Sequence, residues 1–267
     1  MKVVTIDEMR RLEEACAGIG LPPGVLMENA GKAVAVQVQD ILGAIRDRRI
    51  LLLIGPGNNG GDGLVTARFL HDRGASILVY LLKKRPDDDP NLKLVRERGI
   101  TCIDAAQDTG LASLTEALSS TDAVIDAIFG TGRSRPLKGI FRETLEAVQR
   151  TGKNRPKPHL FAVDLPSGLD ADSGNADAAC PYVDDTITLG FPKVGLYNAA
   201  GAERAGRITT VDIGIPSELA GEVKLDLITD EWVRSVLPPR PALANKGSFG
   251  KVMVIAGSER YTGAAYL

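Results

Sequence analysis

Short, almost continuously apolar runs alternate with amphipathic segments along most of the chain. The apolar runs predict buried strands at 49–55, 75–82, 100–104, 122–130, 158–168, 184–191 and 206–216. Apolar residues at helical spacing predict helices between them at 61–74, 90–99, 110–120 and 139–152. Such alternation is typical of a parallel sheet that is covered on both faces. We therefore predict an α/β fold, a Rossmann-like three-layer αβα sandwich with a mostly parallel sheet.

The N-terminal segment, about 5–47, predicts helices that precede the first strand of this sheet. Thr5 and Glu8 have the spacing of a capping box, which favours a helix start at this point. Small and apolar residues continue at helical spacing over 24–42. Pro22 and Pro23 lie between the two stretches and would end the first helix. We expect two N-terminal helices.

Three predicted strands are followed by loops that are rich in Gly, Asp, Asn or Ser. These loops are 55–63, 126–139 and 164–174. In open parallel sheets, ligands bind beyond the carboxyl ends of the strands. The three loops together therefore predict a ligand site at that edge of the sheet.

The composition changes near residue 238. The segment 237–250 contains three prolines, and the apolar run 251–257 after it predicts a new strand. We expect one domain over 1–230, and over 231–267 a linker with the first strand of another domain that is incomplete here.

Net charge and composition exclude several classes of function. The formal net charge is −2, and Lys and Arg are scattered rather than gathered on one stripe, which argues against a nucleic-acid interface. No apolar run approaches the roughly 18 residues that a membrane span needs. The N-terminus carries acids and lacks the apolar core of a signal peptide. With three widely spaced cysteines and no CxxC pair, the sequence predicts a cytoplasmic protein with reduced thiols.

The first loop matches the pattern G-x-G-x-x-G at Gly55, Gly57 and Gly60, which is typical of dinucleotide binding at a helix N-terminus. A conventional NAD site has an acid at the end of the next strand for the ribose hydroxyl. Here the basic run 83–85 stands in its place. Those basic residues either contact phosphate groups or form a solvated turn.

The same loop also carries Asn58, Asn59 and Asp62, which add side-chain oxygens. These side chains could bind ligand hydroxyls or ligate a cation. The alternative is a turn that uses asparagine for its geometry, with Asp62 as the N-cap of the following helix. The sequence favours Asp62 as a cap, which does not exclude contact with a ligand.

The second and third loops offer further polar groups. In the second, Asp126 lies near the strand end, and Arg133 and Arg135 could pair with phosphate oxygens, although an ordinary basic surface loop explains them as well. In the third, Asp164 lies where a strand enters a turn, and Ser167 follows it. Asp164 could act as a general acid and base or could cap the turn. Because the two histidines, His71 and His159, fit structural or surface positions, catalysis would depend on such groups.

These three loops, in this order and after these strands, closely resemble those of the NAD(P)H-hydrate epimerase family. The segments 26–31 and 188–216 also resemble that family, so that the similarity covers about 1–230. The tail 245–267 resembles the opening of the ADP-dependent NAD(P)H-hydrate dehydratase, which is a ribokinase-like domain. The two domains occur fused in bacterial bifunctional repair enzymes. The nucleotide site and catalytic aspartate of the dehydratase are not in these residues, so we expect no dehydratase activity from the chain as given.

The resemblance implies the substrate, the site and an ion. The substrate would be NADHX or NADPHX, the hydrated forms of NADH and NADPH, whose R and S forms the enzyme interconverts. The residues that would contact it are Asn58, Asn59, Gly60, Gly61, Asp62, Gly130, Thr131, Gly132, Arg133, Ser134, Arg135, Pro136 and Asp164. Asn59, Asp126 and Ser167 would hold a potassium ion, because oxygen ligands suit a hard cation.

Asp164 is the expected catalytic acid and base, with Lys83 or Lys84 as a possible helper. ADP or ATP would serve only the dehydratase half of a longer chain. We also expect a homo-oligomer. Two alternatives stay open at this point: a Rossmann-type NAD(P)-dependent oxidoreductase and a non-catalytic nucleotide-binding module.

Overall fold

The computed structural model describes residues 1–132, 136–151, 157–239, 241–245, 247–258 and 263. The chain divides into two compact units. One comprises 2–227, and the other comprises Met1 with 228–267.

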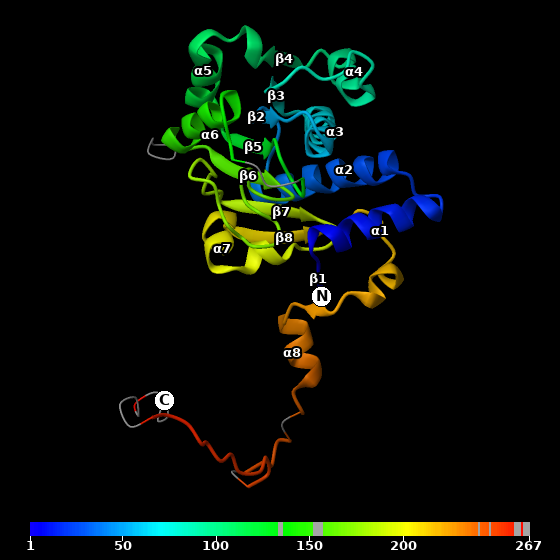
Figure 1. Cartoon of the computed structure of the whole chain (residues 1–267), viewed down its shortest axis with the longest axis vertical. Coiled ribbons are helices and arrows are strands. Elements are labelled where there is room, and N and C mark those ends of the chain that lie inside the picture. The colour runs from blue at the N-terminus through cyan, green and yellow to red at the C-terminus, as the bar shows by residue number, and fades with distance from the viewer. Residues whose placement is uncertain (133–135, 152–156, 240, 246, 259–262, 264–267) are drawn as a thin grey trace. The chain divides into compact units, whose positions relative to one another are not determined.

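The larger unit is built on a parallel sheet of seven strands in the described residues, with the order β4-β3-β2-β5-β6-β7-β8 (Figure 1). The strands are β2 (Arg49–Ile54), β3 (Ser76–Leu81), β4 (Thr101–Asp104), β5 (Ala123–Ala127), β6 (His159–Val163), β7 (Asp185–Leu189) and β8 (Arg207–Val211). All seven lie within or overlap the predicted runs, and the predicted α/β class is confirmed. A short antiparallel pair, β1 (Lys2–Val3) with β9 (Leu225–Asp226), stands apart from this sheet.

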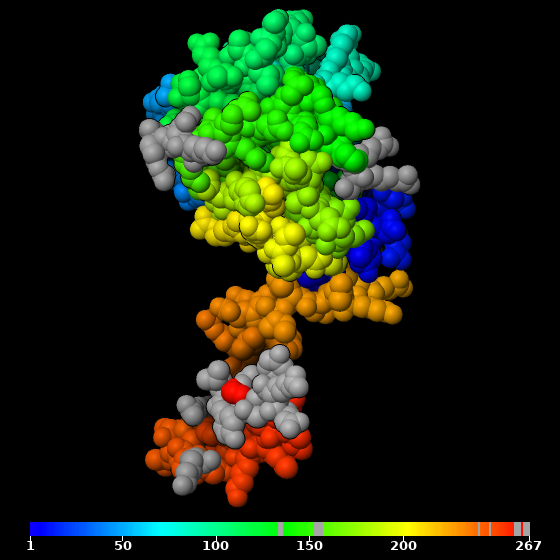
Figure 2. Space-filling view, turned by 60° about the vertical axis from the view of Figure 1, so that its left-hand side comes forward, coloured from blue at the N-terminus to red at the C-terminus, as the bar shows by residue number. Residues whose placement is uncertain are grey.

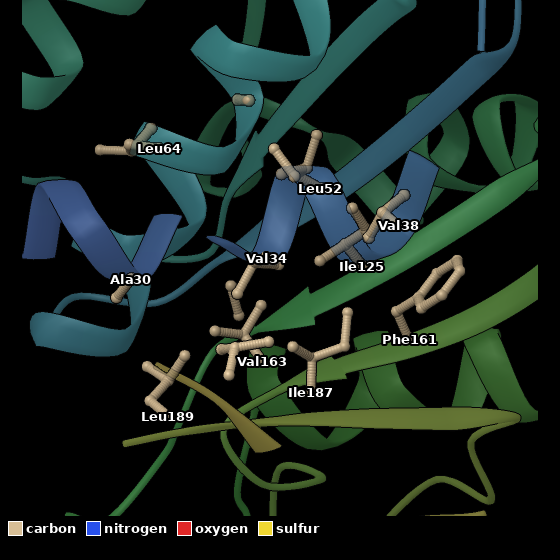
Figure 3. Packing of buried hydrophobic residues seen from close by; sticks show 14 of the residues in the cluster. Ala30, Val34, Val38, Leu52, Leu64, Ile125, Phe161, Val163, Ile187 and Leu189 are labelled. Carbon is tan, nitrogen blue, oxygen red and sulfur yellow. The ribbon is translucent and has the colours of Figure 1, made fainter. Parts of the chain in front are cut away.

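Helices cover both faces of the sheet. They are α1 (Ile6–Gly18), α2 (Pro23–Leu42), α3 (Asn58–Asp72), α4 (Pro90–Glu97), α5 (Ala112–Ser120), α6 (Ile140–Thr151) and α7 (Ala199–Ala205). Alternate residues of β2 enter two separate cores: Leu52 packs with the residues of α2 and α3, and Leu51 with those of α5 and α6. Figure 3 shows the first of these cores, where Val34 and Val38 of α2 lie against the sheet. The green and yellow segments from α5 to β8 pack closely in the space-filling view (Figure 2).

The strand order reverses between β2 and β5. The chain runs from β2 to β3 and β4 toward one edge, then returns to place β5 on the other side of β2. Leu53 therefore pairs with Asp126, and Asp126 pairs with Ala162 of β6. This switch point opens a crevice beyond the carboxyl ends of the strands. The loops after β2, β5 and β6 all leave the sheet beside it.

The two N-terminal helices form as predicted. Thr5 caps α1 in a capping box with Glu8, in which the Glu8 amide donates to Thr5 Oγ1 at 3.3 Å and the Thr5 amide donates to Glu8 Oε2 at 2.8 Å. The predicted break at the two prolines is also found, because Pro22 caps α2 and Pro23 is its first residue.

The prediction that Asp62 caps the next helix is wrong. The structure starts α3 at Asn58, with Gly57 in an extended conformation as its N-cap, so that Asp62 lies inside the helix and is buried. Gly60 and Gly61 fit inside this turn because a Cβ atom would lie 2.0 Å from the Gly55 oxygen at position 60 and 2.6 Å from the Met27 side chain at position 61. Asp62 is therefore not needed as a cap.

The smaller unit contains α8 (Asp230–Val236). The strand predicted over 251–257 is not formed there, and apolar side chains such as Val252 and Ile255 are exposed. A strand needs a neighbouring strand for its backbone hydrogen bonds, and in the described residues no strand pairs with this segment. In the same residues, no helix is long and apolar enough to cross a bilayer.

Asp108 connects β3 to the start of α5. Its carboxylate accepts from the amides of Ser113 at 2.9 Å and Leu114 at 3.0 Å, and from the hydroxyl of the fully buried Tyr80 at 3.0 Å. Burial raises the pKa of Asp108, but these hydrogen bonds outweigh burial, and the pKa lies below the ordinary 3.8.

Asp108→Ala should therefore lower the free energy of unfolding by about 1–3 kcal/mol at neutral pH, because three donors lose their acceptor. A depressed carboxyl pKa adds stability above its unfolded value, and that stability is lost as the pH falls through the folded value. The difference in the free energy of unfolding between wild type and variant, measured by urea denaturation, should therefore become smaller in acid. Tyr80→Phe leaves the amides of Ser113 and Leu114 bonded to Asp108, so it should lower the free energy of unfolding by less. A difference in the free energy of unfolding that does not change with pH would contradict this account.

Candidate active site

A cavity of about 630 Å³ lies beyond the carboxyl ends of the strands in the larger unit. Its walls come from α1, α2, the N-terminus of α3 and the loops after β5, β6 and β7. Of the residues implied by the sequence, the structure places the following at the cavity: Asn58, Asn59, Asp62, Gly130, Thr131, Gly132 and Asp164. Chain segments more than 100 residues apart in sequence thus meet at one site.

The remaining candidates for substrate contact divide into three groups. Gly60 and Gly61 are buried in the first turns of α3, next to the lining residues. Pro136 is exposed and does not line the cavity. Arg133, Ser134 and Arg135 lie outside the described residues.

The N-terminus of α3 forms one wall of this cavity. Gly57, Asn58 and Asn59 line it. The first amides of an α-helix have no acceptor within the helix and carry partial positive charge, which makes this end a binding place for phosphate groups.

Arg85 holds the glycine loop in place. Its Nη1 donates to the carbonyl oxygens of Gly55 at 2.6 Å and Gly57 at 3.1 Å, and its Nε donates to Asp89 at 2.7 Å. A Cβ atom at Gly60 would lie 2.0 Å from the Gly55 oxygen and 2.8 Å from Arg85 Nη1, so this arrangement requires glycine there. Buried Arg85 therefore stabilises the loop rather than facing a phosphate or solvent, the two roles that the sequence suggested. Of the other two basic residues, Lys83 is exposed and Lys84 pairs with Asp87.

Asp164 is the most constrained side chain of the site. It follows β6 with φ at +68°, in the left-handed region that non-glycine residues rarely adopt, and it is 5% exposed. The Lys193 ammonium donates to Asp164 Oδ1, and the Leu189 amide donates to the same oxygen at 3.2 Å. Strained backbone that its surroundings hold in place is frequent at functional sites.

The second oxygen of Asp164 points toward another loop. A Cβ atom at Gly130 would lie 3.0 Å from Asp164 Oδ2 and 3.2 Å from Asn59 Oδ1. Gly130 thus lets the loops after β2, β5 and β6 come together. In the described residues no group donates a hydrogen bond to Oδ2, so it is free to act on a molecule in the cavity.

Lys193 is the functional residue that the sequence did not reveal. It is 0% exposed, and its Nζ also donates to the Leu189 carbonyl at 3.0 Å. An isolated lysine gives no sign in the sequence that it is buried. The rule that ligands bind beyond strand ends could have pointed to it, because Lys193 lies in the segment that follows β7.

Asp126 and Ser167 join the end of β5 to the loop after β6. Ser167 donates to Asp126 twice, from Oγ at 2.6 Å and from its amide at 2.8 Å, and the Phe129 amide donates to Ser167 Oγ at 2.9 Å. Burial raises the pKa of Asp126 to about 6, although the hydrogen bonds from Ser167 and Ile128 lower it in part.

Asn59 is buried, yet neither its amide oxygen nor its amide nitrogen has a hydrogen-bond partner among the described residues. A buried amide without hydrogen-bond partners is unfavourable unless a ligand supplies those partners. Its oxygen, the Asp126 carboxylate and the Ser167 hydroxyl are donors of the type that suits a hard cation. The described residues contain no cluster of three His, Cys, Asp or Glu side chains that could hold a metal. The oxygen donors of Asn59, Asp126 and Ser167 are chemically compatible with potassium.

Asp62 adds a carboxyl group to the wall formed by α3. It is buried and lines the cavity. Burial raises its pKa well above the ordinary value, and the charges of Asp164 and Glu13 add to this effect, while Lys193 and Arg85 oppose it. The site thus holds several carboxyl groups around one buried ammonium.

Comparison with known families agrees with this arrangement. The family described as YjeF-related protein N-terminus matches residues 23–195, which include the glycine loop, Asp126, Asp164 and Lys193. The chain belongs to this family.

Two named relatives lie close to this member of the YjeF-related family. The bifunctional NAD(P)H-hydrate repair enzyme Nnr of Moorella thermoacetica is 38% identical over all of this chain and 51% of its own length. The NAD(P)H-hydrate epimerase of Elusimicrobium minutum is 33% identical over 84% of this chain and all of its own length. The chain spans about half the length of the bifunctional relatives that it matches.

A solved structure shares the fold. The crystal structure of the yeast protein ynu0 aligns with a TM-score of 0.71 and 23% identity, over 86% of this chain and 97% of the yeast chain. This likeness agrees with the parallel sheet described above.

Replacing Lys193 tests the ion pair directly. Lys193→Met should lower the free energy of unfolding by about 3–5 kcal/mol, because the Asp164 carboxylate stays buried without its partner. Lys157→Met is the matched control, since Lys157 pairs with Asp184 at the surface at 2.6 Å and should contribute less than about 1 kcal/mol. Chemical denaturation measures both. Equal, small effects of the two substitutions would contradict the assigned importance of Lys193.

Proposed function

We propose that this protein interconverts the R and S forms of hydrated NADH and NADPH. The observation that carries the proposal is the Asp164 carboxyl group, fixed by buried Lys193 and free at Oδ2 toward the cavity. The cavity lies at the switch point of the sheet, beside a helix N-terminus suited to phosphates. The relatives named as NAD(P)H-hydrate epimerase and repair enzymes support this substrate.

The chemistry needs a proton donor and a proton acceptor. The epimeric carbon of the substrate bears a hydroxyl group and adjoins the ring nitrogen. The nitrogen lone pair helps to expel the hydroxyl group and leaves an iminium-like species, to which water returns on either face. Asp164 would transfer a proton to or from that oxygen. Lys193 keeps the carboxyl group in one orientation, because Oδ1 is held and Oδ2 is left for the substrate.

A potassium ion is the second part of the proposal. Asn59, Asp126 and Ser167 would hold it. When bound, the ion supplies positive charge that offsets the buried Asp126 carboxylate and any negative charge of the substrate nearby. Since Asn59 lies in the first turn of α3, Asp126 near the end of β5 and Ser167 in the loop after β6, they would fix the walls against which the substrate lies.

Other expectations from the sequence stay predictions. They are the cytoplasmic location, the homo-oligomer, and the use of ADP or ATP by a dehydratase half in a longer chain. The assay below separates the proposal from the two alternatives: an oxidoreductase would change the redox state of a nicotinamide cofactor, and a binding module would bind the hydrate without epimerising it.

Asp164→Asn should reduce epimerisation by about 10²-fold or more, because an amide cannot transfer the proton. The assay is chiral chromatography of R-NADHX incubated with the protein, with a separate dehydratase added to consume the S form. Asp87→Asn, at an exposed carboxyl group, is the control and should keep wild-type turnover. Near-normal turnover by Asp164→Asn would refute the assignment.

Potassium should raise the melting temperature relative to an equal concentration of choline. At tenfold excess over its dissociation constant, the ion would add about 1.4 kcal/mol to the free energy of unfolding. Asn59→Ala should abolish this rise yet scarcely destabilise the ion-free protein, because the Asn59 amide has no partner to lose. A variant that still responds to potassium as the wild type does would remove Asn59 from the ion site.

A further inference from the structure

One face of α1 forms a wall of the cavity. Met9, Glu13 and Ala17 follow one another at four-residue spacing and line the cavity together with Arg10. Within this face, Glu13 is the acid whose pKa departs upward from its ordinary value. The proposed mechanism gives Glu13 no role.

Glu13 has charged neighbours but no direct partner. The described residues provide no hydrogen bond or ion pair to its carboxyl group. Residue 13 is exposed, but desolvation of its carboxyl group at the cavity raises its pKa, while Lys193 lowers it and Asp164 raises it. On its own helix, Arg10 lowers the pKa and Glu14 raises it, while Asp62 of α3 also interacts with Glu13. Arg10 itself pairs with Asp7 at 3.5 Å.

Asp164 alone is poorly suited to both faces of a planar intermediate. Its backbone is in the left-handed region, its side chain is buried, and Oδ1 is held by Lys193 and Leu189. A carboxyl group so fixed delivers or removes a proton from one direction. Epimerisation needs the hydroxyl group to leave from one face and water to enter on the other.

We infer that Glu13 is a second acid–base group of the epimerisation and serves the ring face that Asp164 does not reach. The inference rests on the proposed function and extends it. Glu13 fits because it lines the same cavity from another element, has no competing partner and retains access to solvent.

The proton transfers balance between the two carboxyl groups. Neutral Glu13 gives its proton to the leaving hydroxyl group as the C–O bond breaks, and the bond pair leaves with the oxygen as water. The nitrogen lone pair forms the C=N bond. Water then attacks the other face, the C=N pair returns to nitrogen, and the Asp164 carboxylate takes the proton of the water. Glu13 is then ionised and Asp164 is protonated, which is the state that the reverse reaction requires.

Kinetics of Glu13→Gln over a range of pH test the inference. In the wild type, kcat/KM should fall at higher pH, where Glu13 loses the proton that it donates. Glu13→Gln should lower kcat by about 10²-fold with little change in KM, and should lose the high-pH limb. Glu13→Asp should recover part of kcat and also the fall in activity at high pH. Glu116→Gln, at an exposed glutamate of α5, should match the wild type.

Several outcomes would overturn the inference. A Glu13→Gln variant with wild-type kcat and pH profile would do so, as would a variant in which only KM rises. Loss of the high-pH limb in Asp62→Asn but not in Glu13→Gln would assign the role to Asp62 instead. The melting temperature of each variant checks folding. A wild-type protein that does not epimerise R-NADHX would overturn the proposed function itself, which distinguishes that failure from failure of the role given to Glu13.

Discussion

The buried ion pair between Lys193 and Asp164 is the interaction on which the site depends. Removing two charges from water is unfavourable, and the pair is tolerated because their attraction is strong away from solvent and further hydrogen bonds complete it. The Leu189 amide and carbonyl supply two of these bonds. The pair thereby joins the end of β6 to the end of β7. It also orients Asp164 so that one carboxyl oxygen is anchored and the other faces Gly130 and Asn59.

The topology of the sheet explains why these residues meet. Because the strand order reverses between β2 and β5, the loops that follow β2, β5 and β6 leave the sheet side by side. Small residues then allow close approach: Gly60 admits the Gly55 carbonyl and Arg85, and Gly130 admits the side chains of Asn59 and Asp164. Polar groups from distant parts of the sequence therefore share one cavity, and two of them, Asn59 and Asp164, keep an oxygen available for a ligand.

The sequence predicted the helices and strands of the larger unit and the edge of the sheet that carries the site. Strand and helix periodicities depend on residue patterns that are local, and the capping box at Thr5 is a local signal as well. Burial of a single polar residue is not local. Three features depend on contacts between distant segments: the burial of Lys193, the hydrogen bonds from Arg85 to the glycine loop, and the position of Glu13 at the cavity. The sequence did not show them. The early start of α3 was not predicted, because the packing of Gly60 and Gly61 against distant segments is not a local signal. The structure forms no strand over 251–257.

A crystal structure of Asp164→Asn with R-NADHX bound tests the central claim most directly. The account predicts the nicotinamide-derived ring in the cavity, with its hydroxyl group within hydrogen-bond distance of residue 164 and the phosphates at the N-terminus of α3. A hydrated dinucleotide bound elsewhere, or one whose ring points away from residue 164 and Lys193, would contradict it.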